Sequence, residues 1–241
     1  RKVEEVLDRA GIIEHKDKLT PKIYVEIEKQ PDDLINLLFQ SEMVDMMKDK
    51  RTLLVVAAHP DDEVLGCGAT VARLVQEGHT AYVLILGEGD TSRDETRNRT
   101  AKLAEIDALK AESLEANRLI GIKEIYFHDL ADNRFDTVPL LDIVKVIENY
   151  KKEIHPDIIF THFRNDLNID HQIVYRAVIT ATRPLPDEPV KAIYSFESFS
   201  STEWNFPLSF SPNVFINIEN TLELKLKAIS AYHSERRDYP H

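Results

Sequence analysis

The stretch Thr52–Glu63, TLLVVAAHPDDE, decides the fold. Residues 52–58 form a nearly continuous apolar run, which is typical of a parallel strand that is buried on both faces of its sheet. The run ends at a proline-containing turn, and a helix is expected over residues 64–76, closed by Gly78. A buried strand that leads directly into a helix predicts an α/β fold with a parallel sheet.

The same alternation of strands and helices continues toward the C-terminus. Apolar runs predict strands over 81–86, 124–128, 157–161 and 192–196, and amphipathic periods predict helices over 95–119, 140–150, 171–182 and 223–232. The alternating apolar residues of 213–218 predict an added edge or antiparallel strand. This order predicts a Rossmann-like, doubly wound α/β fold, in which a mostly parallel sheet carries helices on both faces.

Residues 1–50 differ from the rest of the chain. They are rich in charge, their apolar positions recur at helical spacing, and a short strand is predicted over 23–27. We interpret the segment as a helical N-terminal extension of the main domain, which spans 51–241, or as the tail of an upstream module. No motif in it indicates chemistry.

The composition excludes several classes of protein. A formal charge of −12 argues against a nucleic-acid partner, because such binding relies on clustered Lys and Arg. The single cysteine, Cys67, excludes a disulfide scaffold. No apolar run reaches the ~18 residues that a membrane span needs. With no signal-like N-terminus, these features predict a soluble, cytoplasmic protein.

Two turns that follow predicted strands are rich in metal-binding side chains. The first is His59-Pro-Asp-Asp-Glu63, and the second is the segment Thr161–His171. Because the carboxyl ends of parallel strands meet at one edge of a sheet, the two turns are expected to converge. Their imidazoles and carboxylates predict a site suited to zinc, with a carboxylate left over as a base. Either turn read alone is equally explained as a helix N-cap.

Together, Ala58-His-Pro-Asp-Asp-Glu63 and the later pair Asp170-His171 resemble the LmbE-like, or PIG-L, family of zinc-dependent de-N-acetylases. The resemblance covers residues 51–241. It implies a Rossmann-like deacetylase domain that hydrolyses the N-acetyl group of an amino sugar.

Matched position by position, the resemblance implies three zinc ligands, His59, Asp62 and His171, with Asp61 as the general base. Three protein ligands leave a fourth position for water, which is the arrangement of a catalytic zinc. Zinc lowers the pKa of such a water to about 7, and a neighbouring carboxylate takes its proton. The same donors also accept iron, cobalt or nickel.

The second motif departs from the commonest family pattern, H-P-D-H, because it reads Asn168-Ile-Asp-His171. Asn168 can donate a hydrogen bond to an oxyanion but cannot deliver a proton. Asp170 either orients a ligand imidazole or caps a helix. The proton for the leaving amine comes either from Asp61 or from another acid, for which the candidates are His128, His162 and His233.

The loops around Asn133 and Trp204 resemble a bacterial branch of the family that is associated with surface-polysaccharide sugars. Arg93 and Arg134 follow predicted strands, and they either hold an anionic part of the substrate, such as a nucleotide diphosphate, or are solvated. Asn133, beside Arg134, is a further candidate substrate contact. Trp204 either stacks on a sugar ring or packs in the interior.

The leading hypothesis is a zinc-dependent de-N-acetylase of an amino sugar that is free, nucleotide-linked or glycan-bound. The alternatives are a deacylase of a sugar-containing thiol or antibiotic intermediate, and a module that binds metal without catalysis. A nucleotide-binding Rossmann domain is disfavoured, because the first strand ends in carboxylates rather than in G-x-G-x-x-G. The expected partner is a small-molecule amino sugar or sugar nucleotide, and a homo-oligomer is compatible with the sequence.

Overall fold

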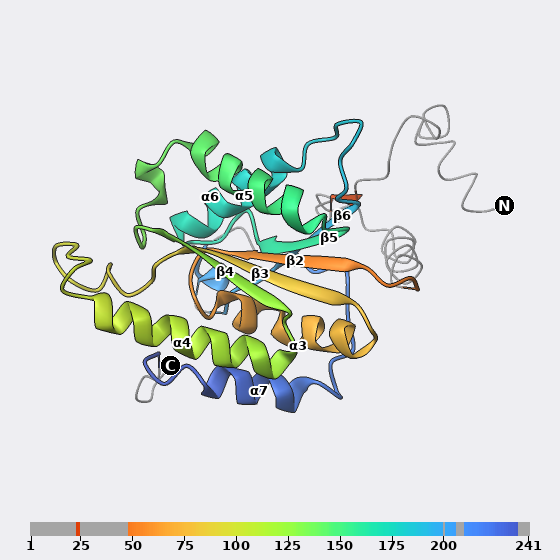
Figure 1. Ribbon diagram of the computed structural model, residues 1–241, viewed down its shortest axis with the longest axis horizontal. Coiled ribbons are helices and arrows are strands. Elements are labelled where there is room, and N and C mark those ends of the chain that lie inside the picture. The colour runs from red at the N-terminus through yellow and green to blue at the C-terminus, as the bar shows by residue number, and fades with distance from the viewer. Residues whose placement is uncertain (1–22, 25–47, 200, 206–209, 236–241) are drawn as a thin grey trace.

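A six-stranded sheet forms the centre of the computed structural model, which describes residues 23–24, 48–199, 201–205 and 210–235 (Figure 1). Its strand order is β1-β6-β5-β2-β3-β4, and every strand pair in the described residues is parallel. The sheet and the helices on its two faces confirm the predicted Rossmann-like α/β fold. No helix among the described residues is long and apolar enough to cross a membrane.

Strands and helices alternate along the chain as the sequence predicts. The strands are β1 (Ile23–Tyr24), β2 (Thr52–Ala57), β3 (Thr80–Gly87), β4 (Glu124–Leu130), β5 (Ile158–His162) and β6 (Ala192–Phe196). The α-helices are α3 (Asp62–Gln76), α4 (Leu103–Ile120), α5 (Leu140–Ile154), α6 (Ile169–Ala181) and α7 (Leu222–Ser230). Two 3-10 helices, η2 (Phe135–Thr137) and η3 (Thr202–Trp204), lie in the connecting loops.

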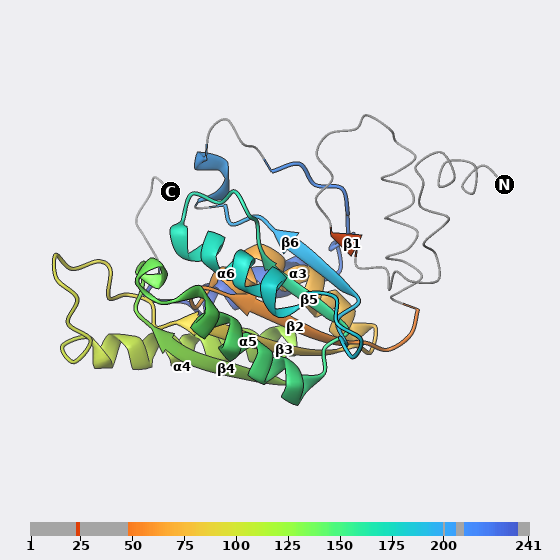
Figure 2. The ribbon, with the colours of Figure 1, turned by 90° about the horizontal axis from the view of Figure 1, so that it is seen from above.

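The sheet is buried on both faces because its side chains alternate between two helical layers. Leu54 and Val56 of β2 pack in a cluster with α5 and α6, whereas Leu53 and Val55 pack with α3. Helices α4 and α7 complete the layer that contains α3 (Figures 1 and 2). The continuous apolar run of β2 therefore reflects a strand with no solvent-facing side.

The chain changes direction across the sheet at β2. From β2 it proceeds through β3 to β4 on one side, and it then returns to β5 and β6 on the other side. Ligands of doubly wound folds bind at such a switch point, beyond the carboxyl ends of the strands. The two turns that carry the potential metal ligands follow β2 and β5, so both lie at this position.

Two predicted elements are wrong. The helix predicted to begin at residue 95 begins at Leu103, because Arg97 and Arg99 bind the buried Glu88 instead of continuing a helix. Residues 213–218 form no strand, although Val214 and Ile216 pack against the sheet cluster, so the apolar alternation reflects burial without backbone pairing.

The N-terminal segment is described only at β1. The pairing of Ile23 and Tyr24 with β6 agrees with the start of the strand predicted over 23–27. The helical extension predicted over 1–50 otherwise lies outside the described residues, apart from 48–50.

The packing of α3 on β6 requires a glycine at position 66. A Cβ atom there would lie 2.1 Å from Cδ2 of Phe196, so Gly66→Ala is expected to lower the free energy of unfolding by about 1–3 kcal/mol. Gly68→Ala, in the same helix, is the matched control, because its Cβ would meet Val64 at 3.3 Å. Chemical denaturation checks both variants, and equal stabilities would contradict this account of the contact.

Candidate metal centre

Three potential metal ligands converge where β2 and β5 end. His59 and Asp62 come from the turn between β2 and α3, and His171 lies in the first turn of α6. Oδ2 of Asp62 is 3.4 Å from Nδ1 of His59 and 3.2 Å from Nε2 of His171. The three potential ligand atoms, one from each of these residues, all lie within 4.8 Å of one another. The structure thus brings together the three residues proposed as ligands.

The turn that holds Asp61 and Asp62 is strained and firmly anchored. Asp61 has φ of 107°, in a region that favours glycine, and such strain concentrates at functional sites. Glu63 anchors the turn, because its buried carboxylate accepts hydrogen bonds from the Asp61 N–H at 3.1 Å, from Asn117 Nδ2 at 2.6 Å and from Tyr232 Oη at 2.7 Å. The base of α3 is therefore fixed to α4 and to the segment after α7.

Each ligand imidazole has a carboxylate behind it. Nε2 of His59 is 3.1 Å from Oδ2 of Asp170 and 3.2 Å from Oδ1 of Asp132. Nδ1 of His171 is 3.2 Å from Oδ1 of Asp166. Carboxylates in this position fix the tautomer and orientation of a metal-binding histidine and raise its basicity.

A third histidine, His162, supports the centre from inside the core. Its ring stacks on that of His171 with centroids 3.9 Å apart, and its Nε2 accepts a hydrogen bond from the Ala58 N–H at 2.9 Å. The proton of the neutral ring is therefore on Nδ1, which lies 3.5 Å from Ser198 Oγ. Burial and the nearby charge of His171 lower the pKa of His162 to about 3. A buried, neutral imidazole is poorly suited to protonate a leaving group.

The carboxylates stabilise positive charge at the centre. Burial opposes a charged His171, but the charge of Asp62 and hydrogen bonds with Asp166 and Asp62 outweigh it and raise the pKa of His171 to about 9. Burial also opposes a charged His59, yet hydrogen bonds to Asp170 and Asp62 raise its pKa well above the usual value. Burial favours a protonated Asp62, but the charge of His171 and hydrogen bonds with His171 and His59 hold its pKa well below the usual value.

These residues fit a divalent transition metal. Two imidazole nitrogens and one carboxylate oxygen are ligands of the kind that zinc binds, and the buried Asp62 carboxylate provides negative charge between them. Burial and repulsion by Asp62 and Glu63 raise the pKa of Asp61, so its carboxylate is a stronger base than that of an ordinary aspartate.

Comparison with known proteins identifies the family of the chain. Residues 54–182, more than half of the chain, match the family model PIG-L, described as GlcNAc-PI de-N-acetylase. The chain belongs to the PIG-L family. Two relatives are the "uncharacterized deacetylase YaiS" of Escherichia coli, 29% identical over 203 residues (82% of this chain, 98% of the relative), and the "probable N-acetyl-alpha-D-glucosaminyl L-malate deacetylase 2" of Bacillus cereus, 26% identical over 188 residues (77% and 84%).

A solved structure shares the fold. The N,N'-diacetylchitobiose deacetylase from Pyrococcus horikoshii, in complex with its inhibitor MPG, superposes with a TM-score of 0.64 at 22% identity, covering 88% of this chain and 82% of that chain. At this identity the likeness shows a shared fold and nothing further.

Asn168, which departs from the commonest PIG-L pattern, caps α6. Its Oδ1 accepts a hydrogen bond from the Asp170 N–H at 2.8 Å, and its Nδ2 donates to Asn133 Oδ1 at 3.1 Å. The cap of this helix is therefore Asn168 rather than Asp170, and the Asp170 carboxylate is directed to His59 and to the Phe135 N–H.

The proposed substrate-binding residues differ in their exposure and in their pairing with other side chains. Asn133 and Arg134 are exposed in the loop after β4, and Trp204 is 63% exposed on η3, so it does not pack in the interior. Arg93 is already engaged, because its guanidinium pairs with Asp90 at 2.9 Å and with Glu235 at 2.5 Å.

The sequence analysis missed residues that complete the centre. Asp132 and Asp166 lie in segments that resemble the family, but no spacing rule assigned them to a particular imidazole. Ser201 Oγ lies 3.4 Å from His171 Nδ1, and Thr202 Oγ1 donates to Asp166 Oδ2 at 2.6 Å, so the loop after β6 also supports the centre. Asp166 lies inside the second motif segment and Asp132 follows β4 at the same edge of the sheet, and these positions are the signal that could have indicated both.

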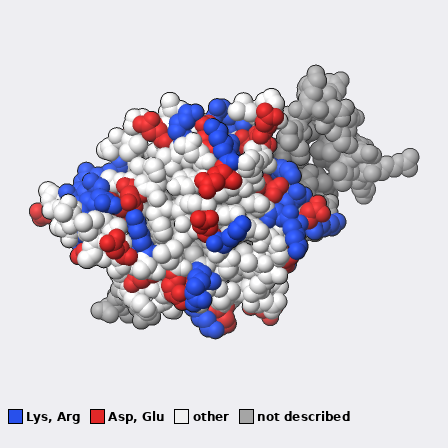
Figure 3. Space-filling view, viewed as in Figure 1, with Lys and Arg blue, Asp and Glu red and all other residues white. Residues whose placement is uncertain are grey.

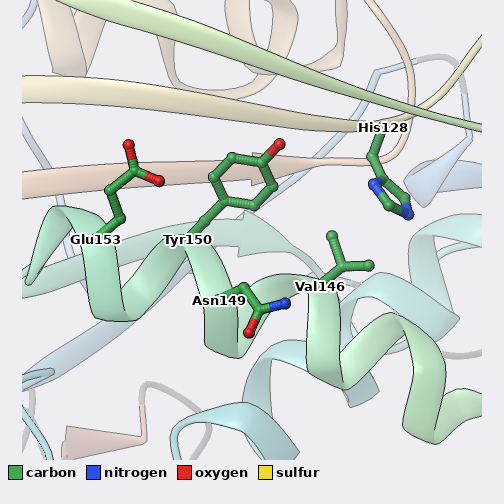
Figure 4. A pocket seen from close by; sticks show the side chains of 5 residues that line it. All are labelled: His128, Val146, Asn149, Tyr150 and Glu153. Carbon is green, nitrogen blue, oxygen red and sulfur yellow. The ribbon is translucent and has the colours of Figure 1, made fainter.

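A cavity of about 310 Å³ lies elsewhere, between β4 and α5 (Figure 4). It is lined by His128, Val146, Asn149, Tyr150 and Glu153, none of which belongs to the metal centre. His128 is thus separated from the ligands in this arrangement, and His233 is exposed after α7. Among the described residues, neither histidine forms a hydrogen bond or ion pair with a residue of the centre.

Removal of the carboxylate behind His171 is expected to weaken metal binding. Asp166→Ala should lower zinc affinity about 10–100-fold, because His171 loses the group that orients it. Competition with a chromogenic chelator measures the affinity. Asp136→Ala, an exposed change in η2, is the control, and equal zinc affinities in the two variants would contradict the role of Asp166.

Proposed function

We propose that this chain is a zinc-dependent hydrolase that removes the N-acetyl group from an amino sugar, whether free, nucleotide-linked or glycan-bound. The observation that carries the proposal is the convergence of His59, Asp62 and His171 next to the Asp61 carboxylate. Relatives that are named deacetylases support the reaction class. The donor atoms support zinc, because two imidazoles and a carboxylate leave a position for water.

The proposed reaction uses a zinc ion and a proton that Asp61 carries from water to the leaving amine. A bound zinc ion would lower the pKa of a water molecule and polarise the acetyl carbonyl. Asp61 takes a proton from the water as the water oxygen adds to the carbonyl carbon. When the C–N bond breaks, Asp61 gives the proton to the amine nitrogen, and the free amino sugar leaves together with acetic acid, which loses its remaining proton to water to give acetate.

Asp61 carries both proton transfers in this proposal. Asn168 has no acidic proton, and His162 is buried and neutral. The carboxylate of Asp61 has no hydrogen-bond partner among the described residues, whereas Asp62 and Glu63 are both engaged. It is therefore the group of the turn that is left for the substrate.

The rim of the centre supplies the proposed substrate contacts. We expect the exposed indole of Trp204 to stack on a sugar ring, and Asn133 and Arg134 to bind polar groups of the substrate. Asn168 is adjacent to Asn133 and can turn an amide N–H toward a developing oxyanion. A substrate contact by Arg93 stays a prediction, as does a cytoplasmic location.

A protein that binds metal without catalysis is the second candidate, because Asn168 replaces a histidine of the commonest family pattern. Release of acetate from N-acetyl sugars distinguishes the two. A deacylase of a sugar-containing thiol or antibiotic intermediate would share the centre and differ in substrate, so a panel of acylated sugars separates it from the leading proposal.

Metal content is the first test. We expect about one zinc per chain in the purified wild type, and loss of that zinc in His171→Ala, because the variant keeps only two of the three ligands. Plasma emission spectroscopy measures both. His233→Ala is the control, since His233 is an exposed histidine outside the centre. A wild type that binds no zinc after reconstitution would refute the metal centre.

Position 61 separates activity from stability. Asp61→Asn should keep zinc and lose acetate release about 10²–10⁴-fold, because the proton carrier is gone. Asp61→Gly should lose activity to the same extent and gain about 1 kcal/mol of stability, because glycine adopts φ of 107° without strain. Acetate assays and thermal denaturation measure the two effects. Full activity in either variant would overturn the proposed role.

A further inference from the structure

A buried carboxylate fixes two arginines just beyond β3. Glu88 follows the last residue of β3 and is fully buried. Its Oε1 accepts hydrogen bonds from Thr91 Oγ1 at 2.7 Å and Arg97 Nε at 2.9 Å, and its Oε2 accepts from Arg99 Nε at 2.8 Å. A buried carboxylate that is paired on both oxygens holds its partners in defined positions.

The two arginines keep unused donors. Arg97 and Arg99 both bind Glu88 through the Nε side of the guanidinium, and Nη2 of Arg99 also binds Asp129 at 2.9 Å. Their side chains are 33% and 38% exposed. Nη1 of each makes no hydrogen bond with the described residues. Because guanidinium donors have fixed directions, the pairing with Glu88 also determines where these unused N–H groups lie.

The local charge has the right sign for an anion. Arg97 and Arg99 pair with Glu88, and Arg99 and Lys110 pair with Asp129, so three cationic side chains share two carboxylates among the described residues. This group therefore carries a net positive charge in a chain of formal charge −12. Figure 3 shows Lys and Arg side chains, with Asp and Glu side chains among them, at the end of the molecule where the loop between β3 and α4 projects in Figure 1.

The same loop connects the arginines to the metal centre. Thr91 binds Glu88, and the next residue, Ser92, donates its N–H to Asp132 Oδ2 at 3.0 Å. Asp132 in turn contacts Nε2 of His59 at 3.2 Å. The adjacent residues Thr91 and Ser92 thus bind Glu88, which holds the arginines, and Asp132, which contacts His59.

We propose that Glu88 presents Arg97 and Arg99 as an anion-binding subsite, which holds a phosphate or carboxylate group on the part of the substrate beyond the amino sugar. The substrate role rests on the proposed function, whereas binding of an anion does not. For Arg93 the sequence analysis left two roles open, a contact to such a group or a solvated position. The structure pairs its guanidinium with Asp90 and Glu235, whereas Arg97 and Arg99 retain donors.

Calorimetry on the zinc-loaded protein tests the subsite with a matched pair of probes, N-acetylglucosamine 1-phosphate and methyl N-acetylglucosaminide. We expect the phosphate to bind more tightly than the methyl glycoside. In Arg97→Gln/Arg99→Gln, affinity for the phosphate should fall about 10–100-fold, as expected for lost charged hydrogen bonds, and affinity for the glycoside should not change. Arg118→Gln is the control, because Arg118 is exposed on α4 and pairs only with Glu115 in the described residues.

A second double variant controls for the loss of folding that an unpaired Glu88 could cause. Arg97→Lys/Arg99→Lys keeps a positive charge for Glu88 and removes the planar fork, so it should also discriminate less between the two probes. Unchanged phosphate affinity in both double variants would place the phosphate at the zinc and overturn the proposal. An equal loss for both probes would overturn it too, because the arginines would then only support the loop.

Acetate release separates this proposal from the proposed function. If the enzyme deacetylates both probes, the double Gln variant should lower kcat/KM for the phosphate about 10–100-fold and leave the glycoside unchanged. If neither probe releases acetate but the arginine-dependent binding of phosphate persists, the deacetylase proposal fails and the subsite stands.

Discussion

The structure depends on one buried charge, the Asp62 carboxylate at the start of α3. An ionised carboxylate in the interior is costly unless cations or donors surround it. Asp62 has the His59 N–H at 2.9 Å and two imidazoles within 3.4 Å, and these groups come from both sides of the switch point. The need to compensate this charge links the first strand and its turn to α6.

The support of the imidazoles is distributed over the whole sheet edge. Asp132 follows β4, Asp166 follows β5, and Asp170 lies on α6, so three separate segments each provide a carboxylate for a ligand histidine. Thr202 adds a contact from the loop after β6. Because these contacts are buried and charged, a shift of any one segment alters the geometry at the centre.

The pattern of apolar residues predicted strands and helices well where a segment is buried by the elements next to it in the chain. The run of β2 and the helix after it appear within two residues of the predicted ends, because apolar patterning there coincides with packing. The predicted start of α4 was wrong because Arg97 and Arg99 bind Glu88, and this tertiary contact outweighs the helical spacing of the apolar residues nearby. The sequence predicted which ligands converge, but the pairing of Asp170 with His59 depends on tertiary geometry.

The backbone at Asp61 also limits which residues that position accepts. Glutamate carries the same carboxylate and would serve equally as a base by its chemistry alone, but a longer side chain is disfavoured at φ of 107°. Aspartate and asparagine tolerate positive φ better than most residues, and glycine does so without cost. The backbone conformation therefore restricts position 61 to a few residue types. Of these, aspartate is the one that also provides a carboxylate.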